Sequence, residues 1–213
     1  MNHFYSRVTY ARLVRLQVII FMEQTLVVVK PDGVMRGLAG SILARFEQIG
    51  LKLVAAKLLT ATDDLAEQHY PADRPELWKG IGQKTLDHYQ DVGEDPEKSM
   101  GTADPHEIGK QVRVWLLNYL KEGPVFAFVL EGPHAVELVR KITGHTLPLK
   151  AAPGTIRGDY SFDSSFLANS AKRPIKNLIH SSGTVDEAKY EIPLWFSKDE
   201  IYSYERVEEK AMR

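Results

Sequence analysis

The sequence contains no cysteine. Disulfide bonds, thiolate zinc sites and cysteine nucleophiles are therefore excluded. Long apolar runs are also missing, because none reaches the roughly 18 residues that a helix needs to cross a bilayer. The formal net charge is only −1 over 213 residues, which gives no support for a general nucleic-acid or membrane surface. We therefore expect no nucleic-acid or membrane partner, and any phosphate binding has to be local.

Common metal motifs are absent as well. The sequence has no HExxH motif and no carboxylate cluster with metal-ligand spacing, so we expect no metal held by protein ligands. What remains is the composition of an ordinary globular protein, with 44% hydrophobic and 26% charged residues. Residues 1–21 carry three arginines and no acid. We interpret them as an N-terminal extension, although a targeting peptide is an alternative, and expect the domain to occupy residues 22–213.

Hydrophobic patterning and turn residues predict alternating strands and helices. The expected elements in chain order are strand 25–29, helix 38–49, strand 51–59, helix 63–70, a helix opening at 104–107, strand 125–130, and helix 133–143. This order is typical of an α/β sandwich of the ferredoxin-like kind, in which helices cover a four-stranded antiparallel sheet.

Two stretches fit this pattern poorly. Residues 71–104 are rich in proline and glycine, which indicates an insertion with one helical piece at 83–89. Residues 144–174 show little regular pattern. Further on, Thr184 and Glu187 have capping-box spacing, so a short helix should begin there and carry Glu191 about two turns along.

The segment 177–184 holds the first candidate for chemistry. His180 follows two aliphatic residues and precedes three small ones, so it should sit where an anchored segment meets solvent. With Glu191 nearby, its imidazole is a candidate nucleophile oriented by an acid. A lone histidine at a helix start is more often a structural or surface residue. The functional interpretation therefore depends on the other polar residues.

Several cationic and polar residues are candidates for binding phosphate. Lys30 ends a buried strand just before a turn, and Arg157 stands between two glycines on a tightly turning segment. Each alone is equally compatible with a solvated turn or a salt-bridged loop. Together with His180 they suggest phosphoryl transfer through a phosphohistidine, in which positive groups hold the phosphates. The complete candidate set for the phosphates comprises Lys30, Arg140, Thr146, Arg157 and Asn177.

At this point the chain resembles a known family, the nucleoside diphosphate kinases. The resemblance covers residues 23–78 and 123–200. It rests on several separate motifs in the right order: 25–37, His69-Tyr70, 153–159, 177–180 and 191–196. It implies a ferredoxin-like fold, assembly as a homo-oligomer (hexamer or tetramer), and a cytoplasmic location. It also implies ping-pong transfer of a γ-phosphate from a nucleoside triphosphate to a nucleoside diphosphate, with Mg²⁺ carried mainly by the nucleotide.

The resemblance also assigns roles to residues. His180 matches the phosphorylated histidine, Glu191 the carboxylate that orients its ring, and Tyr70 a tyrosine packed beside that ring. The nucleotide contacts that match are Lys30, Arg140, Thr146, Arg157 and Asn177, of which Lys30 is also expected to act in catalysis.

Three departures from the family pattern concern base binding and assembly. Insertions are expected near 79–122 and 161–175, and the first falls where the family has its base-stacking phenylalanine, which leaves Trp78 or Leu77 as replacements. Gly183 stands where many members carry an aspartate.

Two alternatives remain: a nucleotide-binding regulator of the same fold with little turnover, and an RNA-binding ferredoxin-like module. The second lacks the basic face and the adjacent-strand aromatics that it would need.

Overall fold

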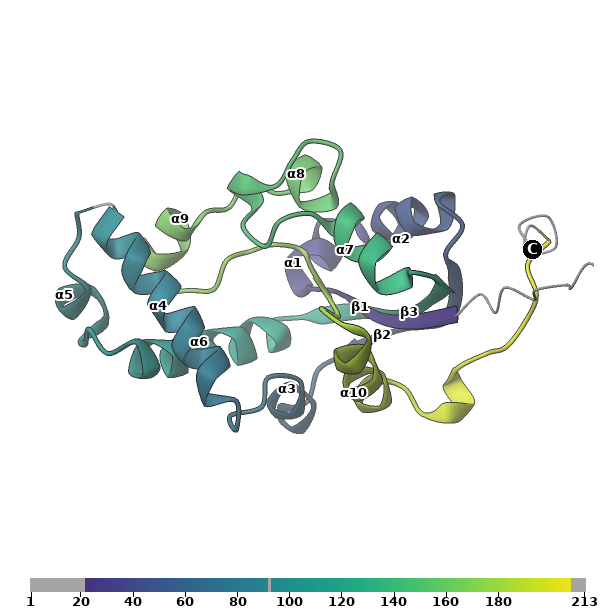
Figure 1. Ribbon diagram of the computed structural model, residues 1–213, viewed down its shortest axis with the longest axis horizontal. Helices are drawn as coiled ribbons and strands as arrows, with labels where there is room; N and C mark the ends of the chain where they lie inside the picture. The colour runs from purple at the N-terminus through teal and green to yellow at the C-terminus, as the bar shows by residue number, and fades with distance from the viewer. Residues whose placement is uncertain (1–21, 92, 208–213) are drawn as a thin grey trace, which may run out of the picture.

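A four-stranded antiparallel sheet forms the centre of the molecule (Figure 1). The computed structural model describes residues 22–91 and 93–207, so the predicted extension 1–21 lies outside the described residues. The strand order is β2-β3-β1-β4. The strands are β1 (Met22–Val29), β2 (Lys52–Thr60), β3 (Pro124–Pro133) and β4 (Ile179–Ser181). The predicted ferredoxin-like α/β sandwich is confirmed.

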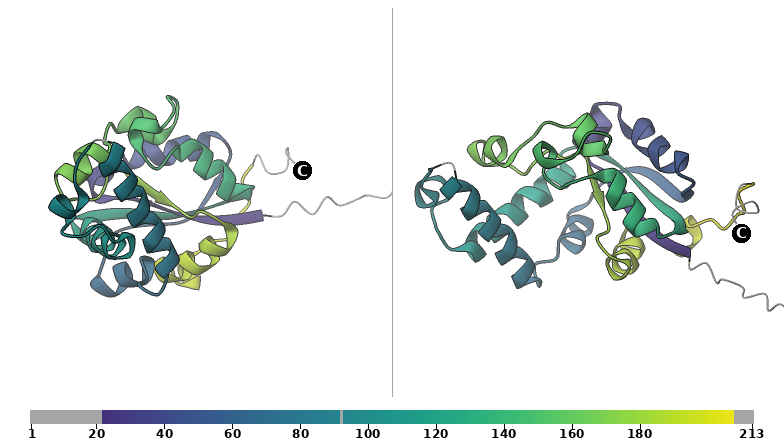
Figure 2. Two further views of the ribbon diagram at one scale, coloured as in Figure 1. Left: turned by 60° about the vertical axis from the view of Figure 1, so that its left-hand side comes forward. Right: turned by 45° about the horizontal axis from the view of Figure 1, so that its top comes forward.

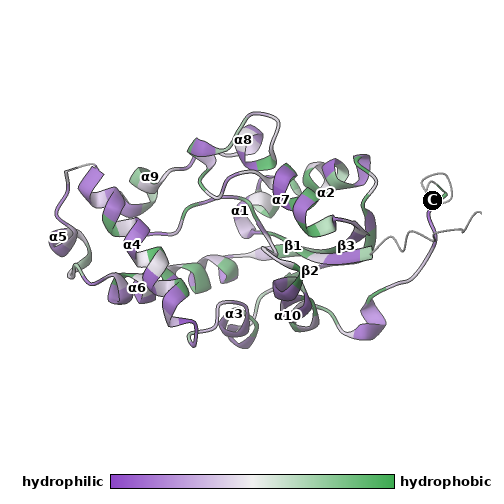
Figure 3. Cartoon of the chain, viewed as in Figure 1, coloured by the Kyte–Doolittle hydropathy of each residue, from purple (hydrophilic) through white to green (hydrophobic). Residues whose placement is uncertain are grey.

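Ten α-helices and two 3₁₀ turns are found in the described residues. They are α1 (Pro31–Met35), α2 (Ala39–Gln48), α3 (Asp63–His69), α4 (Pro75–Asp91), α5 (Pro96–Met100), α6 (Pro105–Lys121), α7 (Ala135–Thr143), η1 (Pro148–Lys150), α8 (Ile156–Tyr160), α9 (Ser165–Ser170), α10 (Val185–Trp195) and η2 (Lys198–Glu200). No helix in this part of the chain combines the length and hydropathy needed to span a membrane. Hydrophobic and hydrophilic stretches alternate along the helices (Figure 3), as expected where one helix face is buried.

Two hydrophobic cores lie on opposite faces of the sheet. Leu26 and Val28 of β1 pack with α6 and α10, whereas Val27 and Val29 pack with α2 and α7. Successive side chains of a strand point to opposite faces, so the apolar run 26–29 of β1 serves both cores. This part of β1 is therefore buried on both sides, and it fixes the backbone on which Lys30 and His180 depend.

The predicted insertion is more regular than the sequence indicated. α4 and α6 pack against each other and project from one end of the sheet (Figures 1 and 2). The predicted helical piece 83–89 was too short, because α4 runs through Gly80 and Gly82. Gly82 is not a helix breaker here. A Cβ at Gly82 would lie 1.8 Å from the carbonyl oxygen of Pro105, so glycine allows the two backbones to approach.

The segment 144–178 also contains regular structure that the sequence pattern missed, namely α8 and α9. Both helices are short and begin at a side-chain cap, Thr155 and Ser164 respectively. Helices of five or six residues carry too little periodicity to be recognised from an apolar stripe, so their caps are the only local signal.

Candidate active site

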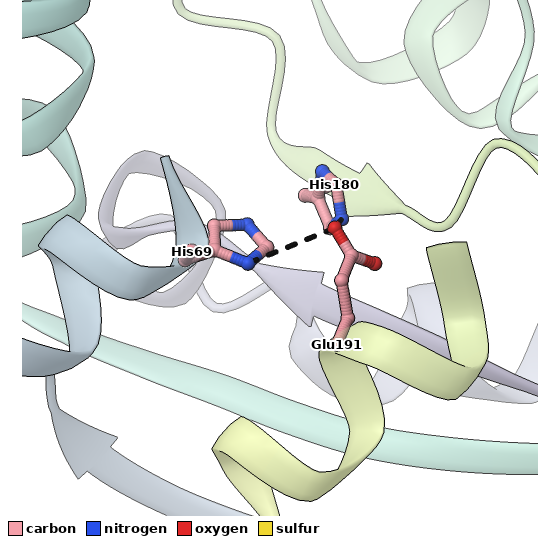
Figure 4. Close-up of side chains that lie close together, drawn as sticks. All are labelled: His69, His180 and Glu191. Atoms are coloured by element: carbon pink, nitrogen blue, oxygen red, sulfur yellow. Dashed lines mark ion pairs between the residues drawn. The ribbon is translucent and has the colours of Figure 1, made fainter. Parts of the chain in front are cut away.

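β4 presents His180 at the edge of the sheet. This strand pairs with the buried strand β1, and His180 is opposite Val28. Nε2 of His180 lies 2.8 Å from Oε1 of Glu191, at ion-pair distance but without the alignment of a hydrogen bond. Figure 4 shows the other ring nitrogen, Nδ1, pointing away from the carboxylate. Nδ1 is therefore the nitrogen that is free to act as a nucleophile.

Glu191 is held on α10, as the capping pattern predicted. The Thr184 side chain caps this helix by accepting from the backbone N–H of Glu187 at 3.1 Å. Ser182 Oγ donates to Oε2 of Glu191 at 2.6 Å. Burial by itself would raise the pKa of Glu191, but the neighbouring His180 outweighs it and lowers that pKa to about 2. Glu191 is therefore a carboxylate at neutral pH, suited to orient the imidazole and to balance its positive charge.

His69 packs directly against His180, and sequence reasoning did not select it. The two rings meet edge to face with centroids 4.4 Å apart. Trp195 Nε1 donates to Nδ1 of His69 at 3.3 Å, and burial lowers the pKa of His69 to about 3, so this ring is neutral. The pair His69-Tyr70 was visible as a motif, but a single sequence does not tell which of two adjacent residues faces inward.

Tyr70 packs against His69. Its ring contacts the His69 ring with centroids 4.7 Å apart, and the ring contact to His180 is made by His69 instead. Burial, followed by the charge of Glu191, raises the pKa of the Tyr70 hydroxyl, which therefore stays protonated. Tyr70 thus contacts the histidine pair through the ring of His69.

The same three groups form the one set of candidate metal ligands in the described ranges. His69, His180 and Glu191 each offer a ligand atom, and these atoms lie within 4.8 Å of one another. The Trp195 N–H already occupies Nδ1 of His69, and the Glu191 carboxylate is engaged by His180 and Ser182. The geometry is therefore explained by hydrogen bonding and ion pairing around the imidazole.

Lys30 and Asn177 meet beside the histidine. Lys30 Nζ, at the end of β1, donates to Oδ1 of Asn177 at 2.8 Å, and only 5% of Lys30 is exposed. Asn177 Nδ2 donates to the backbone oxygen of Thr146 at 3.0 Å. This hydrogen bond holds the exposed Thr146 next to Asn177. Burial, and then the charge of Arg157, lower the pKa of Lys30 to about 7.

Arg157 is buried and anchored to the backbone. Its guanidinium donates to the carbonyl oxygens of Asn177, Gly144 and Ile179 at 3.2, 3.0 and 2.6 Å. These contacts use three of its five N–H donors, so two remain for a ligand. Arg157 thereby also fixes the segment that leads into His180.

Arg140 is the more accessible cation. It is exposed on α7, and its charge contributes to lowering the pKa of Arg157, after the larger effect of burial. The side chain of Arg140 takes part in none of the hydrogen bonds or ion pairs found in the described part of the chain. It lines a cavity together with Gly183 and Thr184, next to the loop that follows His180. Arg140 is thus a cation without a protein partner at the rim of the site.

The expectation that Trp78 stacks on a base is not supported. Only 2% of Trp78 is exposed, and its Nε1 donates to the backbone oxygen of Pro71 at 2.9 Å. Arg113 covers its ring with the guanidinium carbon 5.9 Å from the centroid. Trp78 is therefore a core residue of the α4–α6 pair. Leu77, the other candidate, is 47% exposed.

Comparisons with known proteins identify the family of the chain. The profile of the nucleoside diphosphate kinase family matches residues 23–77 and 105–201. A nucleoside diphosphate kinase of Pyrobaculum aerophilum is 46% identical over 180 residues, covering 84% of this chain and 98% of the relative. The crystal structure of an NDP kinase from the same organism has a TM-score of 0.83 at 44% identity and covers 86% of this chain and 100% of that one.

A second solved structure is also similar to this chain. It is a transition-state mimic of the nucleoside-diphosphate kinase from Borrelia burgdorferi with bound vanadate and ADP. Its TM-score is 0.71 at 38% identity, and the match covers 89% of this chain and 96% of that one. On the strength of these matches, and of a site that joins an oriented histidine to buried cations, the chain belongs to the nucleoside diphosphate kinase family.

Proposed function

We propose that this protein transfers the γ-phosphate of a nucleoside triphosphate to a nucleoside diphosphate through a phosphohistidine at His180. One observation carries the proposal most directly. Glu191 faces Nε2 of His180 at 2.8 Å, which leaves Nδ1 as the nitrogen with a lone pair for phosphorus. The family membership of the chain and the vanadate and ADP bound in the Borrelia structure support the same reaction.

In the first half of the reaction, Nδ1 of His180 attacks the γ-phosphorus. The new N–P bond forms while the bond from phosphorus to the bridging oxygen breaks, and the nucleoside diphosphate leaves with that electron pair. Positive charge then develops on the imidazole. The Glu191 carboxylate at Nε2 stabilises this charge without reorganisation, because Ser182 already holds its second oxygen.

In the second half, a terminal phosphate oxygen of another nucleoside diphosphate attacks the phosphohistidine. The N–P bond breaks, its electron pair returns to Nδ1, and a nucleoside triphosphate leaves. The first product must depart before the second substrate enters the same site, so the scheme is ping-pong. No proton transfer through a second base is needed, which agrees with the neutral state of His69.

The phosphates are proposed to bind the cations around His180. Lys30 and the two remaining donors of Arg157 serve the transferring phosphoryl group, and Arg140 reaches from the rim. Asn177 and Thr146 complete the polar contacts, while Tyr70 supports the histidine pair. Mg²⁺ enters as part of the nucleotide substrate, because the nearby buried carboxylate of Glu191 is committed to His180 and Ser182.

The decisive test is phosphate transfer from radiolabelled ATP. Wild-type protein should gain a label that survives alkali and is lost in acid, and it should make GTP from ATP and GDP. His180→Ala should abolish both, with transfer lower by several orders of magnitude. His88→Ala, which removes a remote histidine on α4, is the matched control and should behave as wild type. Wild-type-like turnover in His180→Ala would overturn the mechanism.

The alternative is a regulator that binds nucleotides with little turnover. It would give nucleotide binding in calorimetry without an alkali-stable label. The ionised Glu191 at Nε2 favours the enzyme, because a binding protein has no need of an oriented nucleophile.

Domain organisation and assembly are proposed from the family resemblance. Residues 22–213 form one kinase domain with insertions near 79–122 and 161–175, preceded by the extension 1–21. The protein acts as a homo-oligomer, a hexamer or tetramer, in the cytoplasm. Light scattering on the purified full chain measures the subunit number directly, and a monomer at working concentration would contradict the oligomer.

A further inference from the structure

Tyr119 connects the helical segment to the active site. It lies near the end of α6, and only 1% of it is exposed. Its hydroxyl donates to Oδ1 of Asp32 at 2.6 Å, across 87 residues of sequence. The proposed reaction assigns no role to Tyr119 or to Asp32. A buried side-chain hydrogen bond of this kind beside a catalytic lysine therefore calls for its own explanation.

Asp32 passes this contact on to the backbone that precedes His180. Its second oxygen, Oδ2, accepts the backbone N–H of Leu178 at 3.2 Å. The carbonyl oxygen of Leu178 accepts from the backbone N–H of Lys30 at 2.8 Å. Leu178 has a φ of +68°, a left-handed conformation that a branched side chain rarely adopts. Such a residue persists only where its surroundings hold it, and here both of its peptide groups are held.

The conformation of Leu178 bears directly on the site, because Asn177 immediately precedes it and His180 follows two residues later. Asn177 accepts from Lys30 Nζ, and the chain then enters β4 with His180 facing Glu191. A change at Leu178 would turn both side chains. The hydrogen bond from Tyr119 to Asp32 thus holds one of the contacts that fix this turn, alongside those that Arg157 makes to the carbonyl oxygens of Asn177 and Ile179.

The ring of Tyr119 makes a second connection. Lys30 Nζ lies 5.0 Å from the ring centroid, and Lys176 Nζ lies 4.8 Å from the same centroid. An ammonium group within about 6 Å of an aromatic ring is attracted by its quadrupole. The Lys30 ammonium is therefore seated between the Asn177 amide oxygen and the Tyr119 ring.

We propose that Tyr119 is a positioning residue for phosphoryl transfer. Its hydroxyl fixes Asp32 and through it the Leu178 peptide, which directs Asn177 and His180, while its ring seats Lys30. The inference rests on the proposed function, since it concerns the rate of that reaction. It gives the projecting α4–α6 pair a catalytic role, because the packing of α6 determines where Tyr119 stands.

Two tyrosine variants separate this role from simple packing. Tyr119→Phe keeps the ring and removes only the hydroxyl. Its kcat should fall about ten- to hundredfold, as expected for a misplaced reacting group, with KM changed less than threefold. Tyr89→Phe is the matched control: Tyr89 is also 1% exposed and lies on α4, and its hydroxyl has no hydrogen-bond partner among the described residues. Tyr89→Phe should keep wild-type kcat.

The chain of contacts from Tyr119 through Asp32 to His180 is tested by single-turnover phosphorylation of His180 with labelled ATP. The measurement is made below the unfolding temperature of each variant. Tyr119→Phe and Asp32→Asn should each slow labelling, and the double variant should be no slower than the slower single variant, because both break one chain of contacts. Tyr119→Leu, which also removes the ring, should be slower than Tyr119→Phe.

The outcomes are distinct. Slow labelling in Tyr119→Phe with non-additive Asp32→Asn supports the proposal. Wild-type labelling rates in Tyr119→Phe, or strictly additive losses in the double variant, would overturn it, even if thermal stability drops. If wild-type protein itself gains no alkali-stable label, the proposed function fails instead. The two failures cannot be confused, because the wild-type label is measured first.

Discussion

His69 lies edge-on against His180, with ring centroids 4.4 Å apart, and it is neutral because burial lowers its pKa to about 3. One buried neutral histidine therefore braces another that is paired with a carboxylate. On the side of His180 away from solvent, His69 therefore contributes a packing contact and no charge. Whether His69 acts through packing or through its ring nitrogens can be measured with two substitutions.

His69→Phe should keep the edge-to-face packing and hence keep kcat within a few-fold of wild type. It should lower the free energy of unfolding by about 1–3 kcal/mol, because the Trp195 N–H loses its acceptor inside the core. His69→Ala removes the brace as well, so its kcat should fall much further. Steady-state kinetics and urea unfolding measure the two effects. Equal losses of kcat in both variants would show that the ring nitrogens, not the packing, matter.

Glu191 should make stability depend on acid. Its folded pKa of about 2 lies below its ordinary value of 4.5, so the ionised form is favoured in the fold. The resulting stabilisation is present above pH 4.5 and is lost as the pH falls through about 2. The shift corresponds to about 3 kcal/mol.

Urea unfolding at fixed protein concentration, from pH 7 down to pH 2.5, measures this contribution. The stability difference between wild type and Glu191→Gln should shrink as the pH falls below 4.5. The exposed Glu76 provides a control, since Glu76→Gln should follow the wild-type curve. A difference that stays constant over the whole range would mean that Glu191 is not held in its ionised form.

The sequence predicted those features of the site that are carried by local chemistry. His180 between aliphatic and small residues, the cap at Thr184, and Lys30 at the end of an apolar strand all have local signatures, and the sheet follows from the apolar runs. The sequence did not identify His69, because the role of this residue depends on which way a helix end turns. It did not identify Tyr119, because the partner of Tyr119, Asp32, is 87 residues away. Long-range pairings of this kind leave no trace in the periodicity of one sequence.

The fold expectations failed where glycine and short helices are involved. Gly80 and Gly82 both precede the predicted helical piece 83–89, yet both lie inside α4, where they have different surroundings. A sequence pattern shows only that glycine is permissive, whereas its function depends on what the missing Cβ would meet. The same limit applies to Trp78, whose burial depends on α6 rather than on its own neighbours in sequence.

Lys30 should couple nucleotide binding to proton uptake. Burial, then Arg157, lower its pKa from 10.5 to about 7, so above neutral pH much of the free protein carries an uncharged amine. Bound phosphate favours the ammonium, and affinity should therefore weaken as the pH rises above 7.

Calorimetry of ADP binding at pH 8 in two buffers of different ionisation enthalpy measures the proton count. Wild-type protein should take up a fraction of a proton, and Lys30→Met should lose this uptake. Lys79→Met, at an exposed position on α4, is the control for removing a lysine. Identical binding enthalpies in the two buffers for wild-type protein would contradict the coupling.

Substitution by alanine should change the free energy of unfolding in opposite directions at three glycines of α4 and α6. It should fall at Gly82 and Gly109 and rise at Gly80. A Cβ at Gly82 would lie 1.8 Å from the Pro105 oxygen, and a Cβ at Gly109 would lie 2.0 Å from the Trp78 oxygen. Both obstacles are backbone atoms, which cannot swing aside. Gly82→Ala and Gly109→Ala should therefore push the helices apart and lower the free energy of unfolding by about 1–3 kcal/mol or more.

Gly80 is the matched position, because a Cβ there meets nothing within 4 Å. Gly80→Ala should raise the free energy of unfolding by about 0.5–1 kcal/mol, since alanine is the better residue inside a helix. Urea unfolding of the three variants compares them directly. Displacement of α6 also moves Tyr119, so Gly82→Ala and Gly109→Ala should lower kcat in the folded protein while Gly80→Ala leaves it unchanged. Destabilised variants with wild-type kcat would separate the packing of this helix pair from the chemistry at His180.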